Sequence, residues 1–222
     1  MKKIIATAAL AAVSCSAFAM PTPGDSSLNT YGPNGAASFV FDTNSATLDV
    51  IDQTGLGISF TAGPLGLTVT SVGTPVGKVI QDRPGNGGLG VDGIIHDDGP
   101  FSDNMGGGEA LRFDFDRAVA LSSIDLNGLV GSNGHTNRAD GRLNFVTSAG
   151  TITVSAADFD GRGTDAALPS IFDSSITWFE VETLSDSWHG YVDSLTARVP
   201  APGIAALLGF GLVGIAAVRR RA

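Results

Sequence analysis

A seven-residue stretch decides the fold class: Glu109-Ala110-Leu111-Arg112-Phe113-Asp114-Phe115. Its apolar and polar residues alternate strictly, so Leu111, Phe113 and Phe115 share one face while Arg112 and Asp114 share the other. Successive side chains of a β-strand point to opposite faces, and this pattern therefore predicts a strand with one buried and one solvated face.

Nine further short windows tend towards the same alternation, separated by turns rich in Gly, Asn and Asp. One pair forms a predicted hairpin across Thr147-Ser148-Ala149-Gly150. With 30 Gly and no long amphipathic helix, the chain is expected to be all-β, an antiparallel β-sandwich or jelly roll formed by residues 20–198 as one domain. The ten predicted strands are Ser38–Phe41, Thr47–Ile51, Gly57–Thr61, Leu67–Val72, Ala110–Phe115, Val119–Leu126, Arg142–Val146, Thr151–Val154, Ile176–Glu182 and Tyr191–Val199.

The segment Asp82–Gly108 breaks this rhythm and is expected to be a long loop, because it is rich in Gly and Asp and poor in large apolar residues. Within it, residues 87–95 fit the calcium-binding nonapeptide of parallel β-rolls. That architecture needs stacked repeats to bury a core, and the sequence holds no second copy.

The first 19 residues have the features of a secretory signal peptide. Lys2 and Lys3 precede an apolar run, Ile4–Val13, and Ala17-Phe18-Ala19 is a small-x-small cleavage site. We expect export through the Sec translocon and cleavage after Ala19. Cys15, the one cysteine, is then lost, which excludes disulfides and thiolate chemistry from the mature chain.

The charge balance is strongly acidic. The chain has 22 Asp and Glu against 13 Lys and Arg, and five of those basic residues lie in the two terminal segments. The remaining part carries a net charge of −14, from eight basic and 22 acidic residues. A field of that sign repels polyanions, so nucleic acid is not an expected partner.

The C-terminal segment 199–222 has three parts. Val199-Pro200-Ala201-Pro202-Gly203 is followed by the apolar stretch Ile204–Val218 and then by Arg219, Arg220 and Arg221. We expect a transmembrane helix, although fifteen residues span only about 22 Å, which is short for a permanent anchor. The arginines favour a cytoplasmic C-terminus and leave the domain outside.

This tripartite tail resembles the PEP-CTERM sorting signal, in which Val-Pro-Glu-Pro precedes a short span and an arginine cluster. Val199, Pro200 and Pro202 match that motif, and Ala201 stands where the family usually has Glu. The resemblance implies processing by exosortase, a membrane transpeptidase of Gram-negative exopolysaccharide producers. It further implies a membrane-attached precursor that is later found at the cell surface or in the extracellular matrix.

Four oxygen-bearing residues are candidate calcium ligands. Asp103, Asn104 and Glu109 flank the start of the clearest strand, and Asp193 lies in the last one. Ca²⁺ takes six to eight oxygen ligands, so these residues would suit it if the two elements are neighbours. The alternative is that Asp103 and Asn104 form a turn while Glu109 and Asp193 are solvated strand residues.

Other candidate sites are less specific. No pair among His96, His135 and His189 has metal-ligand spacing. His189 could form a hydrolytic triad with a nearby Ser and Asp, but no Gly-x-Ser-x-Gly turn supports it. We expect one or both of Trp178 and Trp188 to be core residues, because indoles bury a large apolar area, and a sugar-stacking surface is the alternative.

The sequence therefore favours a non-enzymatic structural or matrix-associated surface protein. A carbohydrate-binding module is the alternative, and a secreted hydrolase is the third hypothesis.

Overall fold

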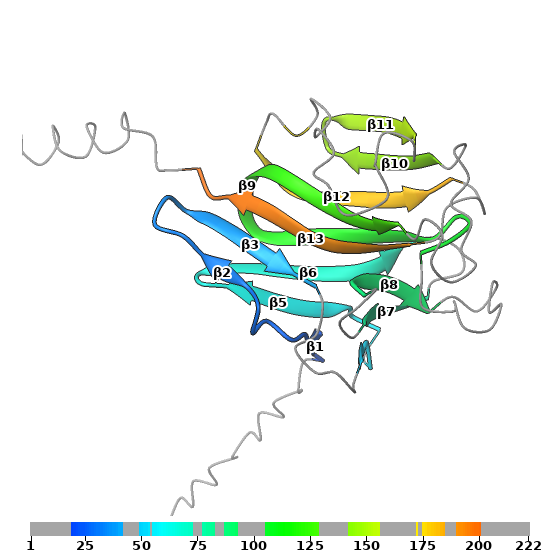
Figure 1. The fold of residues 1–222 in the computed structure, drawn as a ribbon, viewed down its shortest axis with the longest axis horizontal. Helices are drawn as coiled ribbons and strands as arrows, with labels where there is room; N and C mark the ends of the chain where they lie inside the picture. The colour runs from blue at the N-terminus through cyan, green and yellow to red at the C-terminus, as the bar shows by residue number, and fades with distance from the viewer. Residues whose placement is uncertain are drawn as a thin grey trace, which may run out of the picture.

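The computed structural model describes residues 19–41, 49–53, 55–72, 77–82, 87–92, 105–128, 142–155, 172, 175–184 and 190–200. Its named elements are all β-strands, so the all-β prediction holds for the described residues (Figure 1). The strands are β1 (Thr22–Pro23), β2 (Thr30–Tyr31), β3 (Ala36–Val40), β4 (Val50–Ile51), β5 (Ile58–Ala62), β6 (Leu65–Val72), β7 (Lys78–Gln81), β8 (Leu89–Asp92), β9 (Ala110–Gly128), β10 (Arg142–Thr147), β11 (Gly150–Ser155), β12 (Ile176–Thr183) and β13 (Gly190–Arg198).

The thirteen strands form one continuous sheet that bends into a nearly closed, barrel-like shape. Half-sheet 1 has the order β1-β5-β6-β9-β12-β10-β11, and all its pairs are antiparallel except β1 with β5. In half-sheet 2, β13 pairs with β9 on one side and with β3 and β8 on the other, while β2, β7 and β4 lie further out. Every predicted strand overlaps one of these elements.

Strand β9 joins the two halves. Its residues up to Val119 pair with β6 and β12, and those from Ala120 onward pair with β13. At the crossing, consecutive pairs with β12 jump from Asp114 to Val119, and residues 116–118 are exposed. Such an irregularity bends a strand and increases its twist. The sequence predicted two strands here, Ala110–Phe115 and Val119–Leu126, because the intervening residues have no core-facing side.

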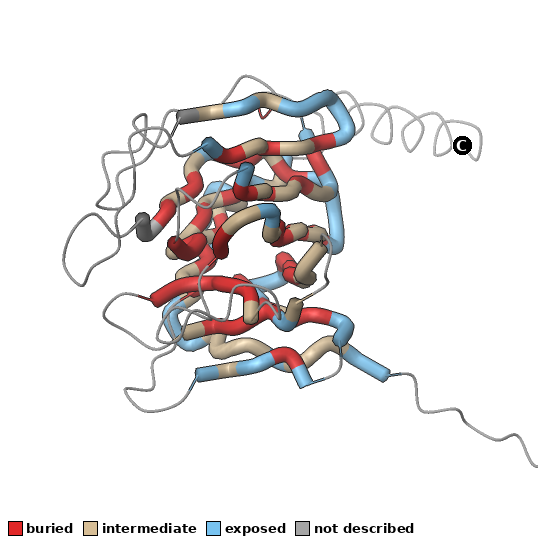
Figure 2. Tube along the Cα trace, turned by 90° about the vertical axis from the view of Figure 1, so that its right-hand side faces the viewer, coloured by how far each residue is buried: buried red, intermediate tan, exposed pale blue. Residues whose placement is uncertain are grey.

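The core lies between the two halves and is rich in phenylalanine. Phe41, next to β3, contacts Phe60 of β5 at 5.2 Å and Phe113 of β9 at 6.0 Å between ring centroids. Phe113 stacks on Phe179 of β12 with the centroids 4.6 Å apart. Figure 2 shows that buried and less buried residues alternate along the strands, as the period of two predicts.

The hairpin prediction is confirmed, because β10 and β11 pair in register from Arg142–Ser155 to the closing pair Thr147–Gly150. The backbone φ of Gly150 is +143°, a value that side-chain-bearing residues rarely adopt.

The long-loop prediction for Asp82–Gly108 is wrong in part. Residues Leu89–Asp92 form β8, which pairs with β7 and β13, and Met105 forms a bridge with Gly190. Three consecutive residues are buried in each of β7 and β8, so neither strand shows a clear alternation. The antiparallel pairing of β8 also differs from the parallel repeats that the nonapeptide pattern would need.

Both ends of the domain are tied to the sheet. The side chain of Gln81 is fully buried and exchanges two hydrogen bonds with the backbone of Asp25, 2.8 Å to its N–H and 3.0 Å to its carbonyl. At the other end, the backbone N–H of Val199 donates to the carbonyl of Gly35 at 3.0 Å. Residues 1–18 and 201–222 lie outside the described part of the chain. These ranges contain most of the predicted signal peptide and most of the predicted transmembrane tail. In the part that is described, no helix combines the length and the apolar composition that a membrane span requires.

Candidate functional site

A group of polar side chains occupies the outer face of half-sheet 1, opposite the phenylalanine core. Arg112 and Asp114 of β9 stand beside Glu180 and Trp178 of β12, because Arg112 pairs with Glu180 and Asp114 with Trp178 in the register. The neighbouring strand β10 adds Asn144, which pairs with Glu182. We call this surface the polar face, and it consists of Arg112, Asp114, Asn144, Thr153, Trp178, Glu180 and Glu182.

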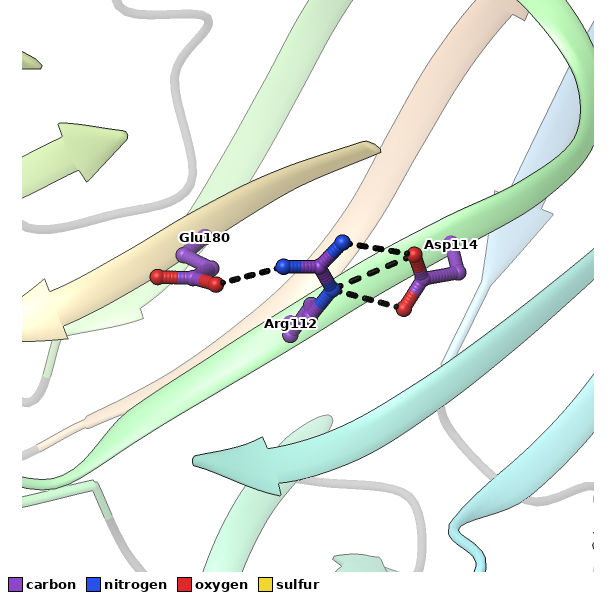
Figure 3. Close-up of polar contacts among 3 residues, drawn as sticks. All are labelled: Arg112, Asp114 and Glu180. Atoms are coloured by element: carbon purple, nitrogen blue, oxygen red, sulfur yellow. Dashed lines mark hydrogen bonds and ion pairs between the residues drawn. The ribbon is translucent and has the colours of Figure 1, made fainter. Parts of the chain in front are cut away.

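Arg112 is the centre of the polar face (Figure 3). Its Nε lies 2.9 Å from Oδ2 of Asp114 and its Nη2 lies 3.1 Å from Oδ1, so the two groups form a bidentate pair. Its Nη1 donates to Oε1 of Glu180 at 3.0 Å. The bonds to Asp114 and then to Glu180 raise the pKa of Arg112, while its partial burial opposes them. The guanidinium is therefore a fixed cation that bridges two strands.

Trp178 lies against the same guanidinium, with Cζ of Arg112 4.1 Å from the centroid of the ring. This distance is typical of a cation–π contact. The interpretation of Trp178 as a core residue is wrong, because the side chain is only half-buried and points to the outer face. A bulge between Ile176 and Trp178 shifts the register at this point. Trp188 lies outside the described residues.

A second row of hydrogen bonds connects strands β11, β10 and β12. The hydroxyl of Thr153 in β11 donates to Oδ1 of Asn144 in β10 at 2.7 Å. The amide of Asn144 then donates to Oε2 of Glu182 in β12 at 3.0 Å. Both rows consist of side chains on rigid strands, which holds their donors and acceptors in fixed positions.

The polar face has the chemistry of a binding surface. It carries one cation, Arg112, and three carboxylates, and is therefore acidic by two charges. On this face of the sheet, an indole ring can stack on an apolar ligand face, and an amide and carboxylates can hydrogen-bond to hydroxyl groups. None of its seven residues is a His, Cys or Ser, so the polar face contains no Ser–His or Cys–His pair.

The structure describes two of the four predicted calcium ligands. Glu109 closes a turn, in which its Oε2 accepts a hydrogen bond from the N–H of Gly106 at 2.8 Å. Asp193 is the extra residue at a bulge in β13, and its carbonyl accepts a bond from the N–H of Phe41 at 2.8 Å. Asp103 and Asn104 lie outside the described residues. Within the described ranges, no three His, Cys, Asp or Glu side chains gather closely enough to hold a metal ion.

The hydrolase hypothesis depends on His189 with Ser185 or Ser187 and with Asp186 or Asp193, and of these residues the structure describes Asp193 alone. His96 and His135 lie outside the described residues as well. Of the predicted sorting motif, Val199 is half-buried against the core and Pro200 is exposed. The other motif residues, Ala201, Pro202, Gly203, Arg219, Arg220 and Arg221, belong to the part that the structure does not describe.

Sequence reasoning did not identify Arg112 and Glu180 as site residues. The usable signal was the alternation that places Arg112 and Asp114 on one face of β9, and Trp178 and Glu180 on one face of β12. The register between these distant strands is what brings them together. No protein-family model matches the chain, and a search of the curated proteins gives no significant match.

Proposed function

We propose that this chain is an exported, surface-sorted protein with a structural, non-catalytic role, and that the polar face attaches it to polysaccharide of the extracellular matrix. The signal peptide and the exosortase-type tail, both inferred from sequence, support the delivery. The contact between Arg112 and Trp178 on the partly exposed outer face of half-sheet 1 is the observation that supports the attachment. We further propose that residues 20–198 adopt a β-sandwich of the jelly-roll type.

The chemistry of the polar face favours a carbohydrate as its ligand. A sugar ring offers an apolar C–H face, which packs on an indole, and hydroxyl groups, which bind planar carboxylate, amide and guanidinium groups. Trp178 and Glu180 of β12 and Asn144 of β10 supply an indole, a carboxylate and an amide on two neighbouring strands. An open sheet surface suits an extended polymer better than a small molecule, which needs a cleft to bury most of its surface.

The charge of the polar face narrows the class of polysaccharide. Its only cation, Arg112, is already bonded to Asp114 and Glu180, and Glu182 adds a further negative charge. An anionic polymer would meet like charge here. The expected ligand is therefore a neutral or amino-sugar polysaccharide.

Affinity electrophoresis of the exported protein in gels containing neutral, basic or acidic polysaccharides tests the proposal. We expect retardation by a neutral or basic polymer. We expect Trp178→Ala to weaken it about fivefold or more, since covering roughly 40 Å² of the indole contributes about 1 kcal/mol. Trp178→Phe should keep part of the affinity.

Tyr31→Ala is the matched control, because Tyr31 is a partly exposed aromatic residue of β2 that lies outside the polar face. It should bind as well as the wild type does. Equal binding by the wild type and Trp178→Ala, or retardation by acidic polymers alone, would overturn the proposal.

A further inference from the structure

Within the described part of the chain, one backbone edge of strand β11 has no partner strand. Among the described strands, β1, β2, β4 and β11 each have a single partner. The first three contain two residues each, β1 includes Pro23, and β4 is flanked by Asp49 and Asp52. Short length, proline and charge are the features that keep sheet edges from pairing with other chains.

Strand β11 has none of these features. It is six residues long, and its sequence, Gly-Thr-Ile-Thr-Val-Ser, contains no charged residue and no proline. The whole hairpin 142–155 carries one charge, Arg142, in a chain that has 22 acidic residues. Two copies of so acidic a protein repel each other over most of their surface, but this hairpin brings no carboxylate to the contact.

The register of the hairpin shows which backbone groups face outward. Antiparallel pairs alternate between those that exchange hydrogen bonds and those that do not. A two-residue turn makes Thr147–Gly150 a bonded pair, so the pairs of Thr151 and Thr153 with β10 are of the other kind. The N–H and carbonyl groups of Thr151, Thr153 and Ser155 are therefore directed to the free edge.

The outward-facing backbone groups of these three residues can pair with those of a second copy of β11. We propose that two copies of this chain pair through β11 in antiparallel orientation, with Thr153 opposite Thr153 on the two-fold axis. Thr151 then lies opposite Ser155, and both outward-facing sets of backbone groups are satisfied. On the inner face, Ile152 lies opposite Val154; these two residues are half-buried in the single chain.

The two-fold axis of this dimer is perpendicular to the sheet and keeps the polar faces of both copies on the same side. The row formed by Glu182, Asn144 and Thr153 then continues across the dimer. If the polar face binds polysaccharide as proposed above, two faces side by side increase its avidity for a long polymer. The dimer itself does not depend on that function.

The size of the contact limits its strength. Stable protein interfaces bury about 1,200–2,000 Å², and a six-residue strand edge offers less than that. We therefore expect a weak dimer with a dissociation constant in the micromolar range or above, favoured where the protein is concentrated on a surface.

Single-cysteine variants of the exported protein test the register. The chain has one cysteine, Cys15, so Thr153→Cys combined with Cys15→Ser carries a single thiol. Opposed residues of a bonded antiparallel pair have Cα atoms about 5.5 Å apart, within the range that a disulfide spans. Under mild oxidation, Thr153→Cys should give a disulfide-linked dimer.

Thr151→Cys is the matched control, because the two Thr151 residues would be four positions apart along the strand, or about 14 Å. It should stay monomeric under the same oxidation. Equal crosslinking of both variants, or none in Thr153→Cys, would overturn the proposal.

Sedimentation velocity supplies a measurement without crosslinks. The wild type should show a concentration-dependent shift from monomer to dimer between micromolar and millimolar protein. Thr153→Lys places a charge at the axis and should abolish this shift. Thr177→Lys adds the same charge at an exposed position of the central strand β12 and should retain it. A wild type that stays monomeric at every concentration would contradict self-pairing. A wild type that binds strands of other proteins but not a second copy of itself would contradict it as well.

Discussion

Replacing Arg112 by Met should destabilise the domain moderately and in a way that salt reduces. Met keeps an apolar stem that covers the sheet but removes the guanidinium from Asp114, Glu180 and Trp178. Asp114 is 44% exposed and Glu180 is 23% exposed, so solvent screens both ion pairs and each contributes about 0.2–1 kcal/mol. The cation–π contact adds about 0.5–1 kcal/mol.

The expected loss in the free energy of unfolding is therefore about 1–3 kcal/mol, which corresponds to a melting temperature about 2–12 °C lower for a domain of this size. Urea unfolding of Arg112→Met, of Glu180→Gln and of the double variant measures the loss and isolates the pairwise coupling between the two side chains. The loss should shrink in high salt. Arg117→Met is the control, because Arg117 forms a similar pair with Asp116 at 2.9 Å but is 46% exposed, and its effect should be clearly smaller.

Two outcomes would refute this reasoning. A loss above about 4 kcal/mol would mean that the guanidinium forms a buried ion pair rather than a solvent-screened one. A loss indistinguishable from zero, with no coupling to Glu180, would mean that the bonds do not hold in solution.

Three further predictions concern acid stability, calcium and processing. The hydrogen bond from Arg117 lowers the pKa of Asp116 in the folded protein. The stability that the Asp116 carboxylate contributes is therefore present above the unfolded-state pKa of about 4 and is lost as pH falls through the lower folded-state pKa. Asp116→Asn should make the free energy of unfolding slightly less dependent on acid pH, as urea unfolding at several pH values would show. The calcium hypothesis predicts a higher melting temperature in millimolar Ca²⁺ and its abolition by Asp193→Asn, and an unchanged wild-type value would reject it. The surface-released protein should begin at Met20 and lack Ile204–Ala222 by intact mass, whereas retention of the terminal arginines would identify an ordinary tail anchor.

The strand positions were predictable because apolar residues at every second position mark the face of the strand that is buried. Leu111, Phe113 and Phe115 mark it in β9, and Leu143 and Phe145 mark it in β10, so both strands were predicted. The signal failed in β8, where three consecutive residues are buried and no alternation remains. It also failed at residues 116–118 of β9, where the strand passes between half-sheets with no residue facing the core.

The polar face was less predictable for a different reason. The sequence shows that Arg112 and Asp114 share a face, but the distance to Glu180 and Trp178 along the chain is more than sixty residues. Their contact depends on the register of β9 with β12, which contains an irregularity at Ile176 and Trp178. A slip of one residue would turn Trp178 towards the core, so the burial of the whole strand sets this register rather than any local motif.

The pairing of β13 has a consequence for the time course of export. This strand, the last of the sheet, pairs with β9, β3 and β8, so residues near the start of the domain receive their partners only from its final residues. Contacts so distant in sequence form slowly, because a long loop must close before any of them is gained. On the proposed export route, β3 and β8 leave the translocon before β13, the strand with which they pair. On that route, folding would be completed only after Arg198, next to the predicted sorting motif, has crossed the membrane, and until then the unpaired early strands would be prone to aggregation.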